Sequence, residues 1–291
     1  MGAVAVVLFL VVGLISTGRA LLGSDGTGAA AGPATTSSTV AATASTSPEA
    51  TAVSTSTSTS EPAPAGPPTA ADPAAMLIIG DSDAGAFGPY LEQLQKETGV
   101  VSTTLDYKVS SGLARPDFYD WPAEISRIVP EVDPDIVVVT FGGNDAQGLT
   151  TADGTVVAGQ PTGDGDEKWR AEYGARVGAV MDALTADGRT LIWVGIPNHQ
   201  NPDVTKRLQV QDEVVRAEVA KRPGVRFVDT WAMFAGKQGG YAEYHVDPRD
   251  GQGKDVRASD GFHLNTVGAE ILAIAISDVV KDDLRARGAA L

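Results

Sequence analysis

The sequence predicts an α/β fold for residues 76–291, a three-layer αβα sandwich around a central parallel sheet of about five strands. Two observations carry this prediction. Short runs rich in β-branched residues alternate with longer helical stretches along the segment. The middle run, residues 136–141, is apolar on both faces, which is typical of a parallel strand covered by helices on each side.

The alternating runs can be placed in order along the chain. We expect strands at 76–81, 102–109, 135–143, 190–197 and 225–230, and helices at 88–98, 122–129, 168–186, 204–222 and 265–287. The last helix would be capped by Asn265 or Thr266. Alternation of this kind gives parallel strands joined by right-handed crossovers. Because ligands bind where the strands of such sheets end, we expect the chemistry at the carboxyl edge.

Residues 1–22 are predicted to be a membrane anchor or a signal segment. Positions 3–15 read AVAVVLFLVVGLI, and the stretch to Leu22 adds one charge, Arg19. The apolar run alone resembles a signal-peptide core, whereas the stretch through Leu22 approaches the about 20 residues of a membrane span. We expect an uncleaved anchor, with cleavage near residues 18–20 as the alternative. Either way, the rest of the chain is expected to be extracytoplasmic, tethered or secreted.

Residues 23–75 are predicted to form a disordered stalk. They consist largely of Ala, Ser, Thr, Pro and Gly. Such a segment has too few large apolar side chains to offset the entropy cost of ordering. The stalk would therefore act as a spacer.

Composition restricts the partners of the chain. The formal net charge is −15 over 291 residues, and there is no cysteine. An acidic chain of this kind lacks the clustered Lys and Arg that bind nucleic acid, and it would not dock on an anionic membrane surface. We therefore expect no nucleic-acid partner and membrane contact through the N-terminal segment only. Without cysteine, disulfides, thiolate nucleophiles and Cys-ligated zinc are excluded.

Small and polar residues form four blocks, three at the ends of predicted strands and one before the last predicted helix. They are Gly80-Asp81-Ser82, Ser110-Ser111-Gly112, Gly142-Gly143-Asn144-Asp145 and, before the last helix, Asp260-Gly261-Phe262-His263. Each block alone is an ordinary turn. In this order, the four blocks resemble those of the SGNH (GDSL-type) hydrolases. The resemblance covers about residues 76–284, including HLNTVGAEILA, which is similar to the final helix of the family.

The resemblance implies a flavodoxin-like fold and an ester or thioester hydrolase that works through an acyl-serine intermediate. A serine hydroxyl needs a base, so Ser82 would be the nucleophile and His263 its base. Asp260 would fix the tautomer of that imidazole. The oxyanion hole would consist of the N–H groups of Ser82 and Gly112 and the side-chain amide of Asn144.

Four further residues are expected to lie near the site or to support it less directly. Asp81 is expected to hold the turn that presents Ser82. Asp83 stands where the family usually has leucine; it is expected to be a favourable charge on the first turn of a helix, or else a group at the cleft mouth that repels anions. His199 is expected to be a solvated loop side chain rather than part of the cleft, and His245 is expected on a loop before the catalytic residues.

No cofactor or metal is expected. The three histidines are widely spaced, and no glycine-rich phosphate loop follows the first strand. A stalked extracytoplasmic domain favours an esterase that removes O-acetyl or other small acyl groups from a cell-envelope glycan. An O-acyltransferase, a lipid or acyl-chain esterase and a catalytically silent glycan-binding module are the alternatives. The aromatic residues Phe118, Tyr119 and Trp121 would either stack on sugar rings or pack inside the fold.

Overall fold

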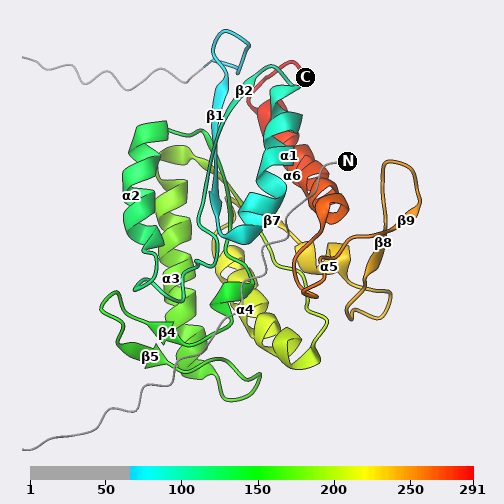
Figure 1. Cartoon of the computed structure of the whole chain (residues 1–291). Helices are drawn as coiled ribbons and strands as arrows, with labels where there is room; N and C mark the ends of the chain where they lie inside the picture. Colours follow the sequence, from blue (N-terminus) through cyan, green and yellow to red (C-terminus); the bar gives the residue numbers. More distant parts are fainter. Residues whose placement is uncertain (1–65) are drawn as a thin grey trace, which may run out of the picture. The chain divides into compact units, whose positions relative to one another are not determined.

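A computed structural model describes residues 66–291 of the chain, with a parallel five-stranded sheet at its centre (Figure 1). The strands, in chain order, are β1 (Ala74–Gly80), β2 (Val101–Tyr107), β3 (Ile136–Thr140), β6 (Thr190–Val194) and β7 (Val225–Val228). Their spatial order is β2-β1-β3-β6-β7, and every neighbouring pair is parallel. The predicted sheet of about five parallel strands is confirmed.

The strand order places a topological switch beside β1. The chain moves from β1 outward to β2, and then crosses back to β3 on the other side of β1. Connections that leave β1 and β3 in opposite directions open a crevice at the carboxyl edge, where ligands of doubly wound sheets bind.

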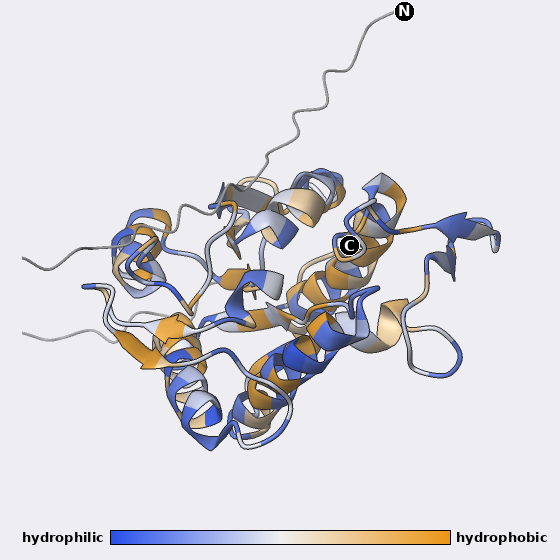
Figure 2. Cartoon of the chain, turned by 60° about the horizontal axis from the view of Figure 1, so that its bottom comes forward, coloured by the Kyte–Doolittle hydropathy of each residue, from blue (hydrophilic) through white to orange (hydrophobic). Residues whose placement is uncertain are grey.

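Helices cover both faces of the sheet. The helices α1 (Ser82–Lys96) and α6 (Thr266–Ala286) pack on one face, and α2 (Trp121–Val132), α3 (Glu167–Thr185) and α4 (Pro202–Ala220) pack on the other. Hydrophobic residues concentrate on the strands and on parts of each helix surface (Figure 2). The predicted three-layer αβα sandwich is therefore confirmed.

The residues of β1 explain why its sequence is apolar without a break. Leu77 and Ile79 belong to the buried cluster under α2, α3 and α4, whereas Met76 and Ile78 belong to the cluster under α1 and α6. All four side chains are buried. Because side chains alternate across a strand, a strand covered on both faces needs apolar residues at every position.

Several predicted boundaries are wrong by a few residues. Helix α1 begins at Ser82 rather than at residue 88, because the Asp81 carboxylate accepts the N–H of Asp83 at 3.0 Å and caps the first turn. Strand β1 begins at Ala74, inside the predicted stalk, where it pairs with Val101. The capping of α6 by Asn265 is confirmed, since its side chain accepts two N–H groups of the first turn.

The sequence did not predict several short elements. They are the hairpin β4 (Leu149–Thr150) and β5 (Val156–Ala158), the hairpin β8 (Tyr244–Val246) and β9 (Gly253–Asp255), the helix α5 (Thr230–Phe234) and two 3₁₀ turns at Gly143–Asp145 and Ala186–Gly188. Elements of two to five residues are too short to show a hydrophobic period.

The predicted N-terminal segment, residues 1–22, and most of the predicted stalk lie outside the described residues. Between residues 66 and 291, no helix combines the length and the apolar character needed to cross a membrane.

Candidate active site

The structure brings the four blocks together at the carboxyl edge of the sheet. Ser82 follows β1 as the first residue of α1, and Gly112 lies in the loop after β2. Asn144 lies in the 3₁₀ turn after β3. Asp260 and His263 lie in the loop that leads into α6. Residues separated by up to 181 positions thus meet beside the topological switch.

Ser82, His263 and Asp260 form a continuous chain of hydrogen bonds. The Ser82 Oγ lies 2.9 Å from His263 Nε2, and His263 Nδ1 lies 2.5 Å from Asp260 Oδ2. When Nδ1 carries the proton and donates a hydrogen bond to the carboxylate, the lone pair of Nε2 faces the hydroxyl of Ser82. This is the arrangement that a general base requires.

The loop itself holds Asp260 in its ionised form. The Asp260 Oδ1 accepts the N–H groups of Phe262 at 2.9 Å and His263 at 3.0 Å. Partial burial would raise the pKa of Asp260, but the hydrogen bonds from these N–H groups and from the imidazole outweigh it and lower the pKa. The carboxylate that faces His263 therefore stays charged at pH values below the ordinary pKa of an aspartate side chain.

Asp81 ties the end of β1 to the end of β3. Its carboxylate accepts the N–H of Gly142 at 2.7 Å and the side-chain amide of Asn144 at 3.2 Å, besides the capping bond from Asp83. Burial raises the pKa of Asp81 well above its ordinary value, and the charge of Asp83 adds to the effect. The expectation that Asp81 holds the turn of Ser82 agrees with these contacts.

Three donors at this edge are available to an oxyanion. Within residues 66–291, the N–H groups of Ser82 and Gly112 meet no acceptor. Asn144 gives one amide hydrogen to Asp81 and keeps the other. Free donors beside a nucleophile are what an oxyanion hole needs.

Asp145 supports the Gly112 loop, a role that the sequence analysis did not assign. Its carboxylate accepts the N–H of Leu113 at 2.9 Å, the N–H of Ala114 at 2.8 Å and the hydroxyl of Tyr173 at 2.8 Å. Burial raises its pKa to about 6 against the opposing effect of these bonds. The only sequence signal was its place as the last residue of Gly-Gly-Asn-Asp.

The same carboxylate explains why position 112 is glycine. A Cβ on Gly112 would lie 2.0 Å from Asp145 Oδ1. The resemblance alone assigned Gly112 to the oxyanion hole. The structure supplies a local physical reason for it.

Asp83 was expected to be a favourable charge on the first turn of a helix, or else a group at the cleft mouth. It does lie in the first turn of α1, but its Oδ2 is buried and has no hydrogen-bond partner within residues 66–291. The hydroxyls of Thr140 and Thr230 are buried and unpartnered in the same way, and all three residues line one small cavity. Burial accordingly raises the pKa of Asp83.

A cavity of about 250 Å³ lies beside the imidazole of His263. Its lining is half polar and half apolar: Gly143, Asn144, His199, Val204, Leu208, Asp260, Phe262 and His263. His199 was expected to be a solvated loop side chain; instead it lines this cavity. His245 lies in β8 rather than on a loop, with its ring 5.5 Å from that of Phe234.

Trp121 does not stack on a ligand. It is fully buried, its Nε1 donates to Ser111 Oγ at 2.9 Å, and its ring packs against Tyr119 and Phe141. Of the three aromatic residues that could have met sugar rings, Phe118 is the exposed one, at 52 %. For Trp121, the packing alternative is correct.

Gly112 also borders an apolar cavity of about 410 Å³. Its wall includes Leu113, Tyr119, Trp121 and the α3 residues Ala175 and Ala179. None of Ser82, Asp260 and His263 lines it. It is therefore a neighbour of the site rather than its centre.

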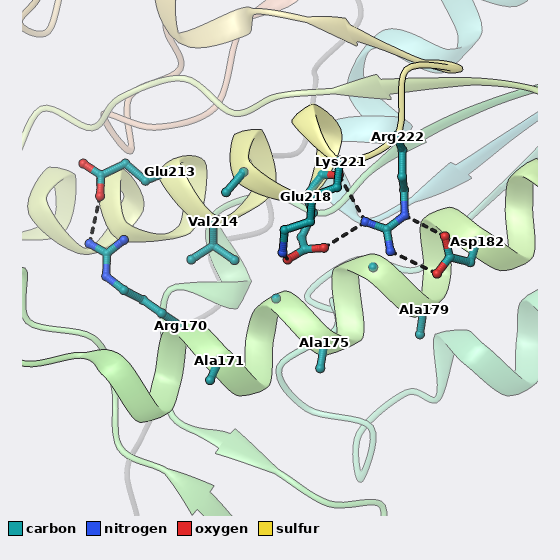
Figure 3. A pocket seen from close by; sticks show the side chains of 13 residues that line it. Arg170, Ala171, Ala175, Ala179, Asp182, Glu213, Val214, Glu218, Lys221 and Arg222 are labelled. Carbon is teal, nitrogen blue, oxygen red and sulfur yellow. Dashed lines mark hydrogen bonds and ion pairs between the residues drawn. The ribbon is translucent and has the colours of Figure 1, made fainter.

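A larger groove of about 720 Å³ runs between α3 and α4 (Figure 3). Two ion pairs span it: Arg170 with Glu213 at 2.8 Å, and Arg222 with Asp182 at 2.6 Å. Arg222 also pairs with Glu218, on its own side of the groove, at 2.8 Å. Because these charges are paired with one another, they are not free to bind a ligand, and the groove belongs to the packing interface of the two helices. No cluster of three or more potential metal-ligating side chains occurs between residues 66 and 291.

The parallel sheet with helices on both faces is the fold of the SGNH (GDSL-type) hydrolases. The structure of a GDSL-like lipase from Bacteroides thetaiotaomicron matches with a TM-score of 0.51 and 15% identity, over 72% of this chain and 88% of that chain. An acetyl-xylooligosaccharide esterase from Geobacillus matches with a TM-score of 0.49 and 19% identity, over 70% and 92%. An alpha/beta hydrolase from the metagenome of Lake Arreo matches with a TM-score of 0.49 and 19% identity, over 72% and 95%.

A family model identifies the chain more narrowly. Residues 75–279 match the family described as "Protein of unknown function (DUF459)". The chain belongs to this family. Comparison with curated proteins yields no match.

Proposed function

We propose that the chain is a serine esterase that cleaves O-acetyl or other small acyl esters through an acyl-serine intermediate. The observation that carries the proposal is the hydrogen-bonded chain from Ser82 through His263 to Asp260, beside free oxyanion donors. A nucleophile, a base and a group that orients the base, all within hydrogen-bond reach, define acyl-transfer chemistry. The fold shared with a GDSL-like lipase supports the same conclusion.

The proposed reaction has two balanced halves. The Ser82 Oγ attacks the ester carbonyl carbon while its proton passes to His263 Nε2, and the carbonyl oxygen becomes an oxyanion that faces the free donors. Collapse of this intermediate breaks the bond to the alcohol, which takes the proton from His263. Water then attacks the carbonyl carbon of the acyl-serine and gives a proton to His263 Nε2. Collapse of this second intermediate breaks the bond between that carbon and Ser82 Oγ, the oxygen takes the proton back from His263, and the acid is released.

Asp260 contributes without changing its protonation state. Its lowered pKa keeps it ionised beside the imidazolium that forms during each half-reaction. A charged carboxylate hydrogen-bonded to Nδ1 stabilises that cation and prevents the ring from rotating.

We propose further that the substrate is an acylated glycan of the cell envelope. The support comes from sequence: an apolar stretch at residues 3–15, followed by an Ala/Ser/Thr/Pro-rich segment, is the arrangement of an extracytoplasmic tethered domain.

Hydrolysis of a simple acetate ester tests the proposal. The purified chain should hydrolyse phenyl acetate, and Ser82→Ala should abolish turnover while the melting temperature changes little. Ser126→Ala, at an exposed position of α2, is the matched control and should keep full activity. Equal rates for wild type and Ser82→Ala would refute the proposed esterase.

A further inference from the structure

The cavity beside His263 contains a hydrogen-bond donor that the proposed reaction does not use. It belongs to His199, in the loop between β6 and α4. The ring lines the cavity together with Asn144 and His263, so a molecule that occupies the cavity meets all three side chains.

Thr205 holds the backbone of His199 in place. The N–H of His199 donates to Thr205 Oγ1 at 2.9 Å, and the hydroxyl of Thr205 donates to the carbonyl of His199 at 2.6 Å. The ring lies nearly parallel to that of Phe262, with centroids 6.2 Å apart and planes inclined by 20°. The ring is therefore positioned by the fold rather than free in solvent.

The hydrogen bonds of the ring also locate its proton. The N–H of Asn201 donates to His199 Nδ1 at 2.7 Å, so Nδ1 carries the lone pair and Nε2 carries the hydrogen. Burial lowers the pKa of His199 despite the opposing charge of Asp260, which keeps the ring neutral. Within residues 66–291, Nε2 meets no acceptor. His199, a residue that lines the cavity, thus carries one neutral N–H donor, at Nε2.

The position of the cavity indicates which half of an ester enters it. His263 must pass a proton to the departing alcohol, so the alcohol lies on the His263 side of Ser82. The cavity is lined by His263 and Asp260 and is therefore on that side. Its volume of about 250 Å³ is below the range of roughly 300–1,000 Å³ for drug-sized ligands. It suits one small unit, with apolar contacts from Val204 and Leu208.

We infer that His199 determines specificity for the alcohol half of the substrate, by donating its Nε2–H to an oxygen of a neutral, hydroxyl-bearing alcohol such as a single sugar unit. This inference rests on the esterase function proposed above. It adds a ligand class and a recognition residue to that site.

The test compares two acetate esters on the full chain. Methyl glucoside monoacetate has a hydroxyl-bearing alcohol, whereas the alcohol of phenyl acetate has no acceptor beyond the ester oxygen. His199→Phe keeps a ring but removes the donor. It should raise KM for the sugar ester about 2- to 10-fold, the range of one neutral hydrogen bond, with kcat nearly unchanged. KM for phenyl acetate should not change.

Controls separate recognition from folding. His245→Phe makes the same substitution on β8, away from the cavity, and should leave both substrates unaffected. His199→Gln retains an N–H donor and should recover part of the lost affinity. Equal losses on both esters after His199→Phe, or no loss on the sugar ester, would overturn the inference.

A binding measurement distinguishes this inference from the proposed function. In the Ser82→Ala background, methyl glucoside should bind, and adding His199→Phe should weaken binding by a similar factor. Failure to bind the glycoside, with phenyl acetate still hydrolysed by wild type, would reject the role of His199 and leave the esterase standing. Glycoside binding without any ester hydrolysis would reject the esterase instead.

Discussion

Asn144 depends on Asp81 for its orientation, because one amide hydrogen is held by that carboxylate at 3.2 Å. The remaining hydrogen is then directed by a fixed amide plane rather than by a freely rotating side chain. A donor of this kind acts on the oxyanion without reorganising during the reaction.

Asn144→Ala should therefore lower kcat for phenyl acetate by about 10²- to 10³-fold, the usual effect of removing one oxyanion donor. Steady-state kinetics and a melting curve check this together. A lower melting temperature with unchanged kcat would instead give Asn144 a purely structural role.

Asp83 places an unpartnered carboxylate oxygen in a buried position beside Ser82. Leaving such a group without a hydrogen bond costs about 1–3 kcal/mol, whereas a favourable charge at the start of a helix is worth only about 0.3–1 kcal/mol. The first effect is larger. Asp83 therefore lowers the free energy of unfolding.

Asp83→Leu should raise the melting temperature, by about 2–4 °C for each kcal/mol recovered. The pKa of Asp83 is raised in the folded protein, so folding favours the protonated form of this side chain. The wild-type protein is therefore least destabilised by Asp83 below about pH 4, where the group is protonated in both states, and it loses stability as the pH rises. The gain from Asp83→Leu should therefore be larger at pH 8 than at pH 4. Asp164→Leu, at an exposed loop position, should show no comparable gain. A gain that is independent of pH would contradict this account.

At the scale of elements, the loop after β2 is held by the turn after β3. Asp145 accepts two N–H groups of that loop, so the Gly112 donor and the Asn144 donor share one support. A change at either element should move both donors.

Gly112→Ala tests this coupling. The new Cβ would lie 2.0 Å from Asp145 Oδ1, so the loop or the carboxylate must shift. The loss of kcat should approach the about 10²- to 10³-fold expected when one donor is removed. Gly159→Ala is the control, because its Cβ would meet nothing within 4 Å. Full activity in Gly112→Ala would show that position 112 does not act in the oxyanion hole.

Element length decided what the sequence could predict. The five strands of the sheet and the five long helices have hydrophobic patterns, and each was found within a few residues. Helix α1 was placed too late because its first turns have several small residues in place of a strong apolar face. The two hairpins and α5 carry no pattern of their own and depend on the contacts around them.

For the whole molecule, the sequence predicted the sheet and the residues that meet at its edge, but not the side chains that support them. Asp145 reaches residues about 30 positions away, and His199 meets Phe262 across 63 positions. Contacts of this kind come from packing between distant segments and leave no local spacing in the chain. For Trp121, the sequence left stacking on a sugar and packing in the core open, and only the packing around it decides between them: the side chain is fully buried.

The central claim is that Ser82 is activated by His263 and can be acylated. Mass spectrometry of the full chain after reaction with a fluorophosphonate, which labels activated serines, measures this directly. We predict one adduct, located on Ser82, whose formation is strongly reduced by His263→Phe and unaffected by His245→Phe. Ser82 left unmodified, or labelled equally well in His263→Phe, would contradict the account.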